Sequence, residues 1–572
     1  MPRAGLAGVC LASLVACAAP RLLSPAAPAA EPAPPAAAQP AASEIAEPAA
    51  PAAPEPHPAF EAVPPVGPDE WWNGAVFYEV YVRSFADSDG DGVGDLRGLT
   101  ARLDDLRSGV GGASGALGVD ALWLMPLFPS PSVHGYDVTD YDTIDPRYGT
   151  LEDFRALIET AHRRGLRVVL DLPLNHTSVL HPWFQDSASG PQAPHRDWYE
   201  WSPKNPGWGQ PWSFSTPAWH RLNGAWYYGV FWSGMPDLNY RNPAVRQEME
   251  RIVRLWLSRG VDGFRLDAAR FLVETGPGRG QVSTPETHAF LKELAQEARG
   301  ERPDAALIGE VWSITEDIAD YYGNGSDELQ LLPDFPLAAA AVSAAKNGRV
   351  EELSRVLAEV VRSYPRVAVD APFLTNHDQI RLATQLGGDP GRLRLAAALL
   401  LTLPGSPIVY QGEELGQENG PGQEDEEKRL PLSWDCQAPG HGFTTGSPWH
   451  PFGPDAGRDC ASAERDDPGS LRSWYRTLIA LRHLSPALRR GSLELVPVPG
   501  APRTVLAFLR RSGTEAVLVV HNAGAEAADT GPLPVAGERS EPLLPGTARL
   551  ERQGDGWRAV LPPLSSGAWR LR

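Results

Sequence analysis

Short, mostly apolar runs alternate with helical patterns over most of this chain. The runs lie at residues 75–82, 119–125, 166–172, 261–266, 305–308, 366–374 and 407–410. Apolar runs of this length are typical of strands that are covered on both faces. Between them, apolar residues recur at three- and four-residue spacing, most clearly over residues 151–164 and 243–259. Alternating strands and helices form a parallel sheet, so the pattern predicts an α/β fold with a (β/α)8 TIM barrel.

Two stretches interrupt this alternation. Residues 176–240 are rich in Trp, Pro and Gly, and we interpret them as a small domain inserted after the third strand. Beyond a helical pattern at residues 471–484, short β-like runs are separated by Gly and Pro turns. This pattern of short strands and turns predicts a C-terminal all-β sandwich over residues 491–572. The barrel is then expected over residues 69–175 and 241–490.

The first 17 residues have the features of an export signal. Arg3 precedes an apolar run, Leu6–Val15, that is too short to span a bilayer. The end of this run, Leu14-Val15-Ala16-Cys17, resembles the lipobox of bacterial lipoproteins, which implies that Cys17 is acylated. A plain signal peptide cleaved nearby is the alternative. Residues 18–68 are almost entirely Ala, Pro and Glu, which predicts a disordered tether. We therefore expect an exported protein, anchored by lipid to a membrane at the cell surface or in the periplasm.

The charge balance excludes one class of partner. The formal net charge is -20, whereas nucleic-acid binding requires a basic surface that displaces counterions. A neutral polymer needs no charge steering, so an acidic surface is compatible with it. Of the four cysteines, Cys10 and Cys17 lie in the signal segment, and Cys436 and Cys460 remain. Export makes a disulfide between these two possible, although the sequence does not show that they meet.

Acidic residues follow four of the predicted strands, each with a polar companion. The segments are DLPLNH at 171–176, GFRLDAAR at 263–270, GEVW at 309–312 and FLTNHD at 373–378. Barrel enzymes carry their catalytic groups at the C-terminal ends of the strands. One such acid could be a helix cap, but capping does not explain four acids with polar companions.

Together, these segments resemble the four motifs of glycoside hydrolase family 13, the α-amylase family. A fifth segment, MPDLN at 235–239, resembles the group intermediate between oligo-1,6-glucosidases and neopullulanases, which includes bacterial α-amylases. The resemblance runs from about Trp71 to the C-terminus and implies an α-glucan substrate. It also implies that Asp267 is the nucleophile of a retaining hydrolase, Glu310 its general acid/base and Asp378 the stabiliser of the transition state. Structural ion pairs are the alternative for these acids.

The neighbouring residues agree with this interpretation. Arg265 and Asp267 are two positions apart on one strand and face the same way, so the guanidinium is expected to favour ionised Asp267. The resemblance further implies that His176 and His377 bind sugar hydroxyls and that Tyr136 stacks on the sugar. Arg429 resembles an arginine that closes the site in oligo-1,6-glucosidases. A core tyrosine, structural histidines and a surface arginine are the alternatives.

An Asp- and Gly-rich loop at residues 87–95 is the metal candidate. Hard cations prefer several oxygens at alternating positions of such a turn. The candidate ligands are the carboxylates of Asp87, Asp89, Asp91 and Asp95 and the carbonyl of Val93. An EF-hand is excluded, because its twelfth position would be Gly98 rather than Glu. The resemblance implies a Ca2+ site after the first strand with this pattern; a solvated acidic turn is the alternative.

A second calcium site of the family uses the motif Asn and an Asp of the inserted domain, here Asn175 and Asp237. Arg270 and Phe271 stand where calcium-binding amylases often have Lys and His. The sequence therefore leaves this second site open.

The resemblance favours an α-amylase that cleaves α-1,4 bonds inside starch, glycogen or maltooligosaccharides. We also expect the protein to be a monomer. Exo-acting relatives usually have an Asp three residues before the stacking Tyr, where this chain has Val133 next to His134, as in α-amylases. An exo-acting α-glucosidase or oligo-1,6-glucosidase, a glucanotransferase or sucrose- or trehalose-converting relative, and a non-catalytic family member remain the alternatives.

Overall fold

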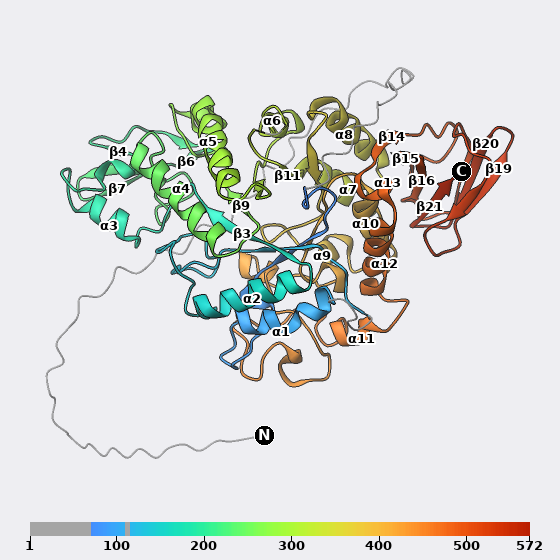
Figure 1. Cartoon of the computed structure of the whole chain (residues 1–572), viewed down its shortest axis with the longest axis horizontal. Helices are drawn as coiled ribbons and strands as arrows, with labels where there is room; N and C mark the ends of the chain where they lie inside the picture. The colour runs from blue at the N-terminus through green and yellow to red at the C-terminus, as the bar shows by residue number, and fades with distance from the viewer. Residues whose placement is uncertain (1–69, 109–114, 326) are drawn as a thin grey trace, which may run out of the picture. The chain divides into compact units, whose positions relative to one another are not determined.

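The computed structural model describes residues 70–108, 115–325 and 327–572, all of which belong to one compact unit. Its central sheet has eight parallel strands in the order β12-β11-β10-β9-β3-β2-β1-β13 (Figure 1). The strands are β1 (Phe77–Val80), β2 (Ala121–Leu124), β3 (Arg167–Pro173), β9 (Gly263–Asp267), β10 (Ala306–Gly309), β11 (Leu331–Pro333), β12 (Val369–Ala371) and β13 (Ile408–Tyr410). Backbone bonds from Ser406 to Asp370 (2.7 Å) and from Ile408 to Pro372 (2.9 Å) join the two ends of the sheet. The predicted TIM barrel is confirmed.

One barrel strand was missed in the sequence. β11 is only three residues long and ends in Pro333, so it shows neither an apolar run of useful length nor any periodicity. The strand expected over residues 366–374 is likewise reduced to β12. Short strands suffice here because each is paired on both sides or joined across the barrel seam.

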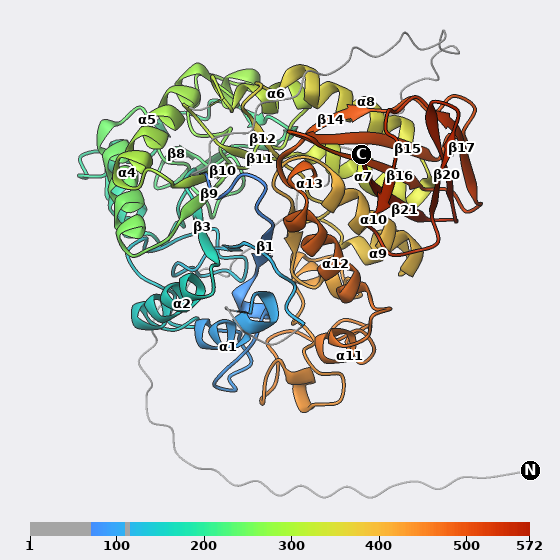
Figure 2. The ribbon, with the colours of Figure 1, turned by 45° about the vertical axis from the view of Figure 1, so that its right-hand side comes forward.

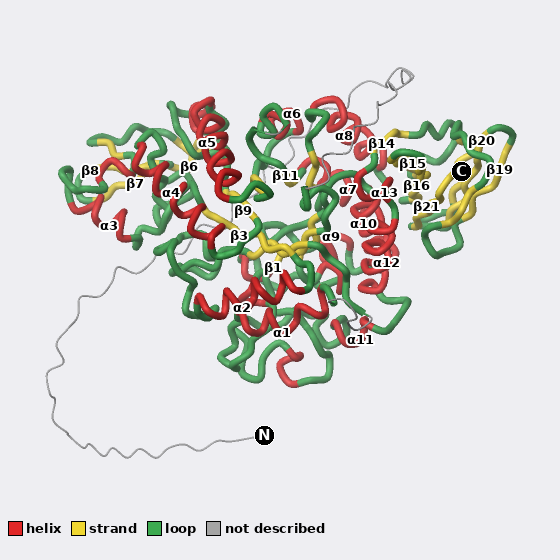
Figure 3. Tube along the Cα trace, viewed as in Figure 1, coloured by secondary structure: helices red, strands yellow, loops and turns green. Residues whose placement is uncertain are grey.

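Helices cover the strands (Figures 2 and 3), and several of them begin at a capping side chain. Thr150 and Asp153 form a capping box at the start of α2, and Asn242 caps α4, which opens with Pro243. The helices are α1 (Leu96–Leu106), α2 (Leu151–Arg163), α4 (Pro243–Ser258), α5 (Pro285–Glu301), α6 (Thr315–Asp320), α7 (Phe335–Asn347), α8 (Val350–Ser363), α9 (Leu382–Leu386), α10 (Pro390–Thr402), α11 (Ala461–Arg465), α12 (Leu471–Leu484) and α13 (Pro486–Arg490). Among the residues that the structure describes, no helix is long and apolar enough to cross a membrane.

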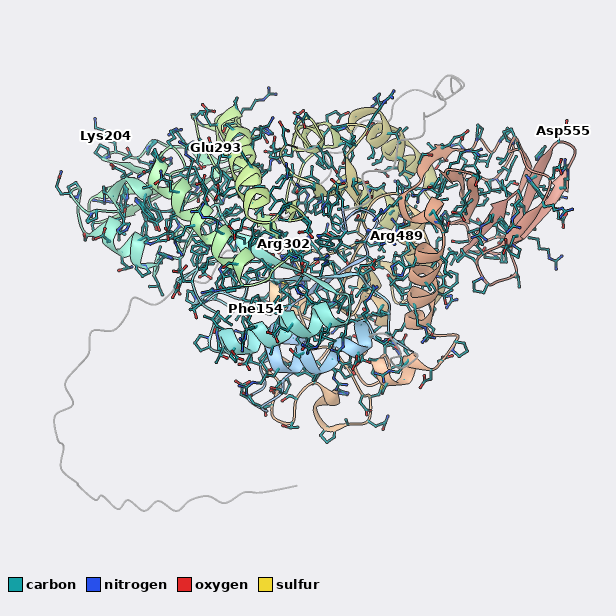
Figure 4. The ribbon with its side chains drawn as sticks, viewed as in Figure 1. Phe154, Lys204, Glu293, Arg302, Arg489 and Asp555 are labelled. Carbon is teal, nitrogen blue, oxygen red and sulfur yellow. A yellow bond between two sulfur atoms is a disulfide. The ribbon has the colours of Figure 1, made fainter. Side chains whose placement is uncertain are left out.

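The segment between β3 and α4 forms two small antiparallel sheets and one helix. The sheets have the orders β4-β8-β7 and β5-β6. Backbone bridges from His176 to Asp237 and from Tyr199 to Leu238 tie the beginning of the segment to its end. Figure 4 labels Lys204 at its outer margin. The elements are α3 (Pro182–Ser189), β4 (Trp201–Ser202), β5 (Gly209–Gln210), β6 (Ser213–Pro217), β7 (Trp219–Leu222) and β8 (Ala225–Tyr228).

The C-terminal segment is an antiparallel sandwich, as expected. One sheet has the order β14-β15-β16-β21-β18 and the other β17-β20-β19, with Asp555 at the tip of the β19–β20 hairpin (Figure 4). Leu518 of the first sheet and Trp557 of the second lie in one apolar core. The strands are β14 (Ser492–Leu495), β15 (Val505–Ser512), β16 (Glu515–Asn522), β17 (Ala528–Leu533), β18 (Ser540–Pro542), β19 (Arg549–Gln553), β20 (Gly556–Leu561) and β21 (Ser565–Leu571).

Two buried arginines bind the C-terminal end of α10, and one of them, Arg510 of β15, joins the sandwich to the barrel. Arg510 donates to the carbonyls of Thr402 (2.5 Å), Gly491 (3.0 Å) and Ser492 (3.2 Å). Arg482 donates to the carbonyls of Leu401 (3.2 Å) and Leu403 (2.8 Å), next to the same helix end. The guanidiniums thus satisfy carbonyls that α10 leaves unpaired where it ends. Burial lowers the pKa of Arg510 well below its usual range, and the charge of Arg482 adds to this effect.

Replacing Arg510 with Leu should lower the melting temperature by several degrees. Each carbonyl left without a donor costs about 1–3 kcal/mol. Arg511→Leu is the matched control, because Arg511 is the next residue on β15 and its side chain is 44% exposed. Calorimetry of both variants tests the idea, and equal melting temperatures would contradict it.

Candidate active site

Inward-facing side chains change from apolar to charged along the barrel strands. Val169 belongs to the apolar core of the barrel. Two residues further along β3 lies Asp171, which is in register with Arg265 of β9. Both of these side chains are buried. Because residues two apart on a strand face the same way, the alternation that builds the core also places charges at the C-terminal end of the barrel.

Arg265 lies at the centre of the charged layer. Its Nη1 donates to Asp267 Oδ1 (2.7 Å) and to both oxygens of Asp171 (2.9 and 3.1 Å). Its Nη2 lies 3.2 Å from Glu310 Oε2. The side chain of Arg265 is 1% exposed, whereas those of Asp267 and Glu310 are 12% and 16% exposed. One buried guanidinium therefore holds two solvent-accessible carboxyl groups next to each other.

The arginine is one of several influences on the pKa of Asp267. Burial raises the pKa of Asp267 well above its usual range, and Arg265 opposes this without outweighing it. The negative charges of Glu310 and Asp171 add to the rise in the pKa of Asp267. The strand spacing predicted both the contact and the direction in which Arg265 acts, since Arg265 lowers the pKa of Asp267. The net rise of that pKa comes from burial and the surrounding acids, which the spacing did not include.

Glu310 is oriented by the backbone after the nucleophile candidate. The N–H of Ala268 donates to Glu310 Oε2 (3.0 Å). Ala268 has a φ of 51°, a left-handed conformation that residues with a side chain rarely adopt. Local strain of this kind persists where the surrounding structure fixes it. Here it aims a donor from the end of β9 at the acid on β10.

A second group of contacts links Tyr136, His377 and Glu79. The hydroxyl of Tyr136 donates to Asp171 Oδ2 (3.0 Å) and lies 2.7 Å from His377 Nε2, and the two rings are stacked at 5.6 Å. His377 Nδ1 lies 2.5 Å from Glu79 Oε1. Burial would lower the pKa of His377, but Asp378 and Glu79 outweigh this and raise the pKa. The cluster therefore favours a charged imidazole.

Arg429 closes this group on the side of Asp378. Its Nη2 donates to Asp378 Oδ1 (2.9 Å) and its Nε donates to the carbonyl of His377 (3.0 Å). The Arg429 side chain is 3% exposed, so it is not a surface arginine. Burial would raise the pKa of Asp378, but His377 and Arg429 outweigh it, and the pKa of Asp378 is lowered. The surroundings of Asp378 and Asp267 thus move the pKa values of these two carboxyl groups in opposite directions.

His176 lies at the edge of the inserted segment. Burial lowers the pKa of His176 to about 3, so the imidazole is neutral. Asn175 Oδ1, Asp237 Oδ2 and Glu274 Oε1 are buried and have no hydrogen-bond partner among the described residues. Burial raises the pKa of Asp237 to about 8. The structure brings Asn175 and Asp237 together, and it adds Glu274, which the sequence reasoning missed. Three buried oxygens of this kind fit a hard cation.

The loop after β1 gathers some of the expected metal ligands. Carboxylate oxygens of Asp87, Asp89 and Asp95 all lie within 4.8 Å of one another. Asp91 is not in this group, and its carboxylate instead accepts a bond from the N–H of Val93 (2.7 Å). Burial would raise the pKa of Asp87, but donors from Thr444 and the loop backbone outweigh it, and the pKa is lowered. Carboxylate oxygens from three residues, lying this close together, are ligands of the kind that Ca2+ prefers.

A distant segment packs against this loop. Thr444 Oγ1 donates to Asp87 Oδ2 (2.5 Å), and the N–H of Trp449 donates to the carbonyl of Gly92 (2.9 Å). Cys436 and Cys460 form a disulfide that brackets this segment. The sequence left the pairing open, because the closeness of the two cysteines depends on the folded barrel. Cys17, the signal segment and the tether lie outside the described residues, and the lipid anchor stays a prediction.

Comparisons with known proteins agree on one family. A family model described as "Alpha amylase, catalytic domain" matches residues 79–491. α-Amylase 3 of Dictyoglomus thermophilum is 39% identical over 459 residues, covering 79% of this chain and 85% of that protein. The trehalose synthase/amylase of Mycobacterium tuberculosis is 35% identical over 511 residues, covering 79% and 82%. The crystal structure of the α-amylase from H. orenii has a TM-score of 0.78 at 36% identity, covering 87% and 99%.

The barrel and these relatives define an enzyme that acts on glycosidic bonds. The chain belongs to the α-amylase family, glycoside hydrolase family 13, which includes hydrolases and transglycosylases. The family predicted from the five sequence motifs is confirmed. Asp171 was identified as the acid of the first motif but was given no role, and Glu79 was not among the predicted site residues, although each is an acid within a run of buried strand residues. That placement was the signal that could have assigned them to the site.

Proposed function

We propose that this enzyme is a retaining α-amylase that cleaves α-1,4 bonds inside glucan chains. The observation that carries the proposal is the pair of accessible carboxyl groups held by Arg265. Asp267 attacks the anomeric carbon and forms a glucosyl ester, while Glu310 gives its proton to the departing oxygen. Water then attacks the same carbon as Glu310 takes its proton, and the bond to Asp267 breaks. Asp378 binds the sugar at the cleavage site, with its charge maintained by Arg429 and His377.

Internal cleavage is supported by the residue before Tyr136. Val133 packs against the apolar group formed by Tyr81, Met125 and Tyr136, so this position offers no carboxylate to the terminal hydroxyls of a sugar. His134 is next to it, with its imidazole 30% exposed. Position 133 therefore provides no acidic group that could bind the terminal sugar of a glucan chain. The 35% identical trehalose synthase/amylase supports glucosyl transfer as the second candidate.

Amylose digestion distinguishes these functions. An internal cut shortens the polymer quickly, so iodine staining should be lost while few reducing ends have formed. Maltotriose should be hydrolysed slowly and isomaltose not at all. Release of glucose at constant staining would instead indicate exo action, and trehalose or longer oligosaccharides from maltose would indicate transfer.

Glu310→Gln should lose about 10²–10⁴-fold in kcat on maltooligosaccharides, because general acid catalysis contributes on that order. α-Glucosyl fluoride needs no proton on its leaving group, so the variant should form the glucosyl ester from it at near-parental rate. The negative charge of Glu310 helps to raise the pKa of Asp267. Replacing Glu310 with Gln removes this charge, so the pKa of Asp267 should fall. The acidic limb of the pH–rate profile for ester formation should therefore move to lower pH.

Asp267→Asn is the matched control, since it removes the nucleophile and should be inactive on both substrates. Trapping the ester by mass spectrometry after mixing with the fluoride measures the outcome directly. A Glu310→Gln enzyme that is equally impaired on both substrates, or one whose acidic limb moves upward, would contradict the assigned roles.

We further propose that the loop after β1 holds Ca2+ through Asp87, Asp89 and Asp95. A ligand that binds only the native state stabilises it, by about 2.7 kcal/mol at one hundred times the dissociation constant. Chelation should therefore lower the melting temperature, and Asp89→Asn should abolish this response. Asp91→Asn is the matched control, because Asp91 lies in the same loop but outside the oxygen cluster.

Calorimetry with and without chelator, together with elemental analysis, tests this assignment. Loss of the response in both variants would place Asp91 among the ligands, and an unchanged melting temperature in the parental enzyme would argue against any metal. A second equivalent of calcium that disappears in Asp237→Asn would identify the site at Asn175 and Asp237.

A further inference from the structure

The inserted segment exposes aromatic side chains on its β5–β6 hairpin. Trp212 is 36% exposed and Phe214 is 77% exposed. Large exposed apolar side chains in a soluble domain often mark a binding surface. The ring of Trp212 lies 5.5 Å from that of Phe231 and 5.4 Å from that of Phe271. We call Trp212, Phe231 and Phe271 the aromatic platform.

The platform is a fixed structure. The rings of Phe231 and Phe271 lie 5.7 Å apart at 78°, an edge-to-face contact that restrains both. Gln210, next to the turn of the hairpin, donates to the carbonyls of Val230 (2.9 Å) and Phe231 (2.8 Å). Phe231 is thereby tied to the hairpin that carries Trp212. Both phenylalanines remain partly exposed, so the three rings form a surface and do not close into a core.

The platform lies beside the strand ends that carry the two reacting carboxyl groups. Phe271 follows Asp267 by four residues, and the neighbouring Arg270 donates to the carbonyl of Trp312, two residues after Glu310. Phe231 is in ring contact with His176 at 5.3 Å. Tyr136, Asp378 and Arg429 come from other strand ends, after β2, β12 and β13.

The position of the platform beside the reacting carboxyl groups determines which part of the substrate it can contact. The departing oxygen must lie within reach of the acid that protonates it, so the leaving half of the glucan extends on the Glu310 side. Aromatic faces suit the apolar CH faces of a neutral sugar. The nearby Arg270 guanidinium, 5.7 Å from the centre of the Phe271 ring, can donate hydrogen bonds to sugar hydroxyls. The occupant is therefore the glucosyl units on the leaving side of the cleaved bond.

We infer that the aromatic platform binds these leaving-side glucosyl units and so determines which bond of an oligosaccharide is cut. The inference rests on the proposed α-amylase function. Each binding mode places a different number of units on either side of the reacting carboxyl groups. Modes with several units over the platform are stabilised, so bonds well inside the reducing end are preferred.

Maltoheptaose labelled at its reducing end tests the inference. The leaving half carries the label, so the parental enzyme should release labelled fragments of two or more units. Trp212→Ala should shift cleavage toward labelled glucose and lower kcat/KM by about fivefold, the size expected for one aromatic contact. Trp212→Phe keeps an aromatic face and should retain the parental pattern. Leu484→Ala changes a side chain that is 76% exposed on α12, and it should change nothing.

The outcomes separate the platform from the function on which it rests. An unchanged cleavage pattern in Trp212→Ala, with parental cleavage intact, overturns the platform alone. A parental enzyme that cleaves no bond of the labelled chain overturns both. A uniform loss of rate in Trp212→Ala without any shift between products also overturns the inference, because it would indicate only a structural role.

Discussion

The burial of one guanidinium inside the barrel is the constraint on which the rest of the site depends. A charge removed from water costs several kcal/mol unless opposite charges and hydrogen bonds satisfy it. Arg265 meets this requirement with Asp171, Asp267 and Glu310, which come from three neighbouring strands. A shift of one residue in any of these strands would turn its acid away from the interior. The ion cluster and the strand register therefore stabilise each other.

The surroundings of the acids in this site shift their pKa values in different directions. Negative charges outnumber the arginine, so the pKa of Asp267 is raised by its burial and its acidic neighbours. Asp378 lies against Arg429 and His377, and its pKa is lowered although burial acts against this. Two identical carboxyl groups in one site thus have pKa values that their surroundings move in opposite directions. Environments that move pKa values apart are the usual way in which an enzyme assigns different tasks to similar side chains.

The sequence predicted what depends on local pattern and missed what depends on tertiary contact. α12 begins and ends where its periodicity did, and the inserted and C-terminal segments follow changes of composition. β11 was missed because its three residues show no period. The spacing of Asp91 matched the other acids of its loop, but its carboxylate lies outside the oxygen cluster that Asp87, Asp89 and Asp95 form in the folded loop. Glu274 could not be identified, because its neighbour Asp237 is brought to it only by the fold of the inserted segment.

The closure of the barrel has a consequence for the order of synthesis. β1 pairs with β13, which lies more than three hundred residues later in the chain, and Glu79 and Asp87 have partners 298 and 357 residues later. While the ribosome is still translating, the strand at Phe77–Val80 is an apolar edge whose partner does not yet exist. Such an edge invites pairing with other chains. Nascent copies therefore need to be kept apart, by chaperones or by an extended state, until the last strand has emerged.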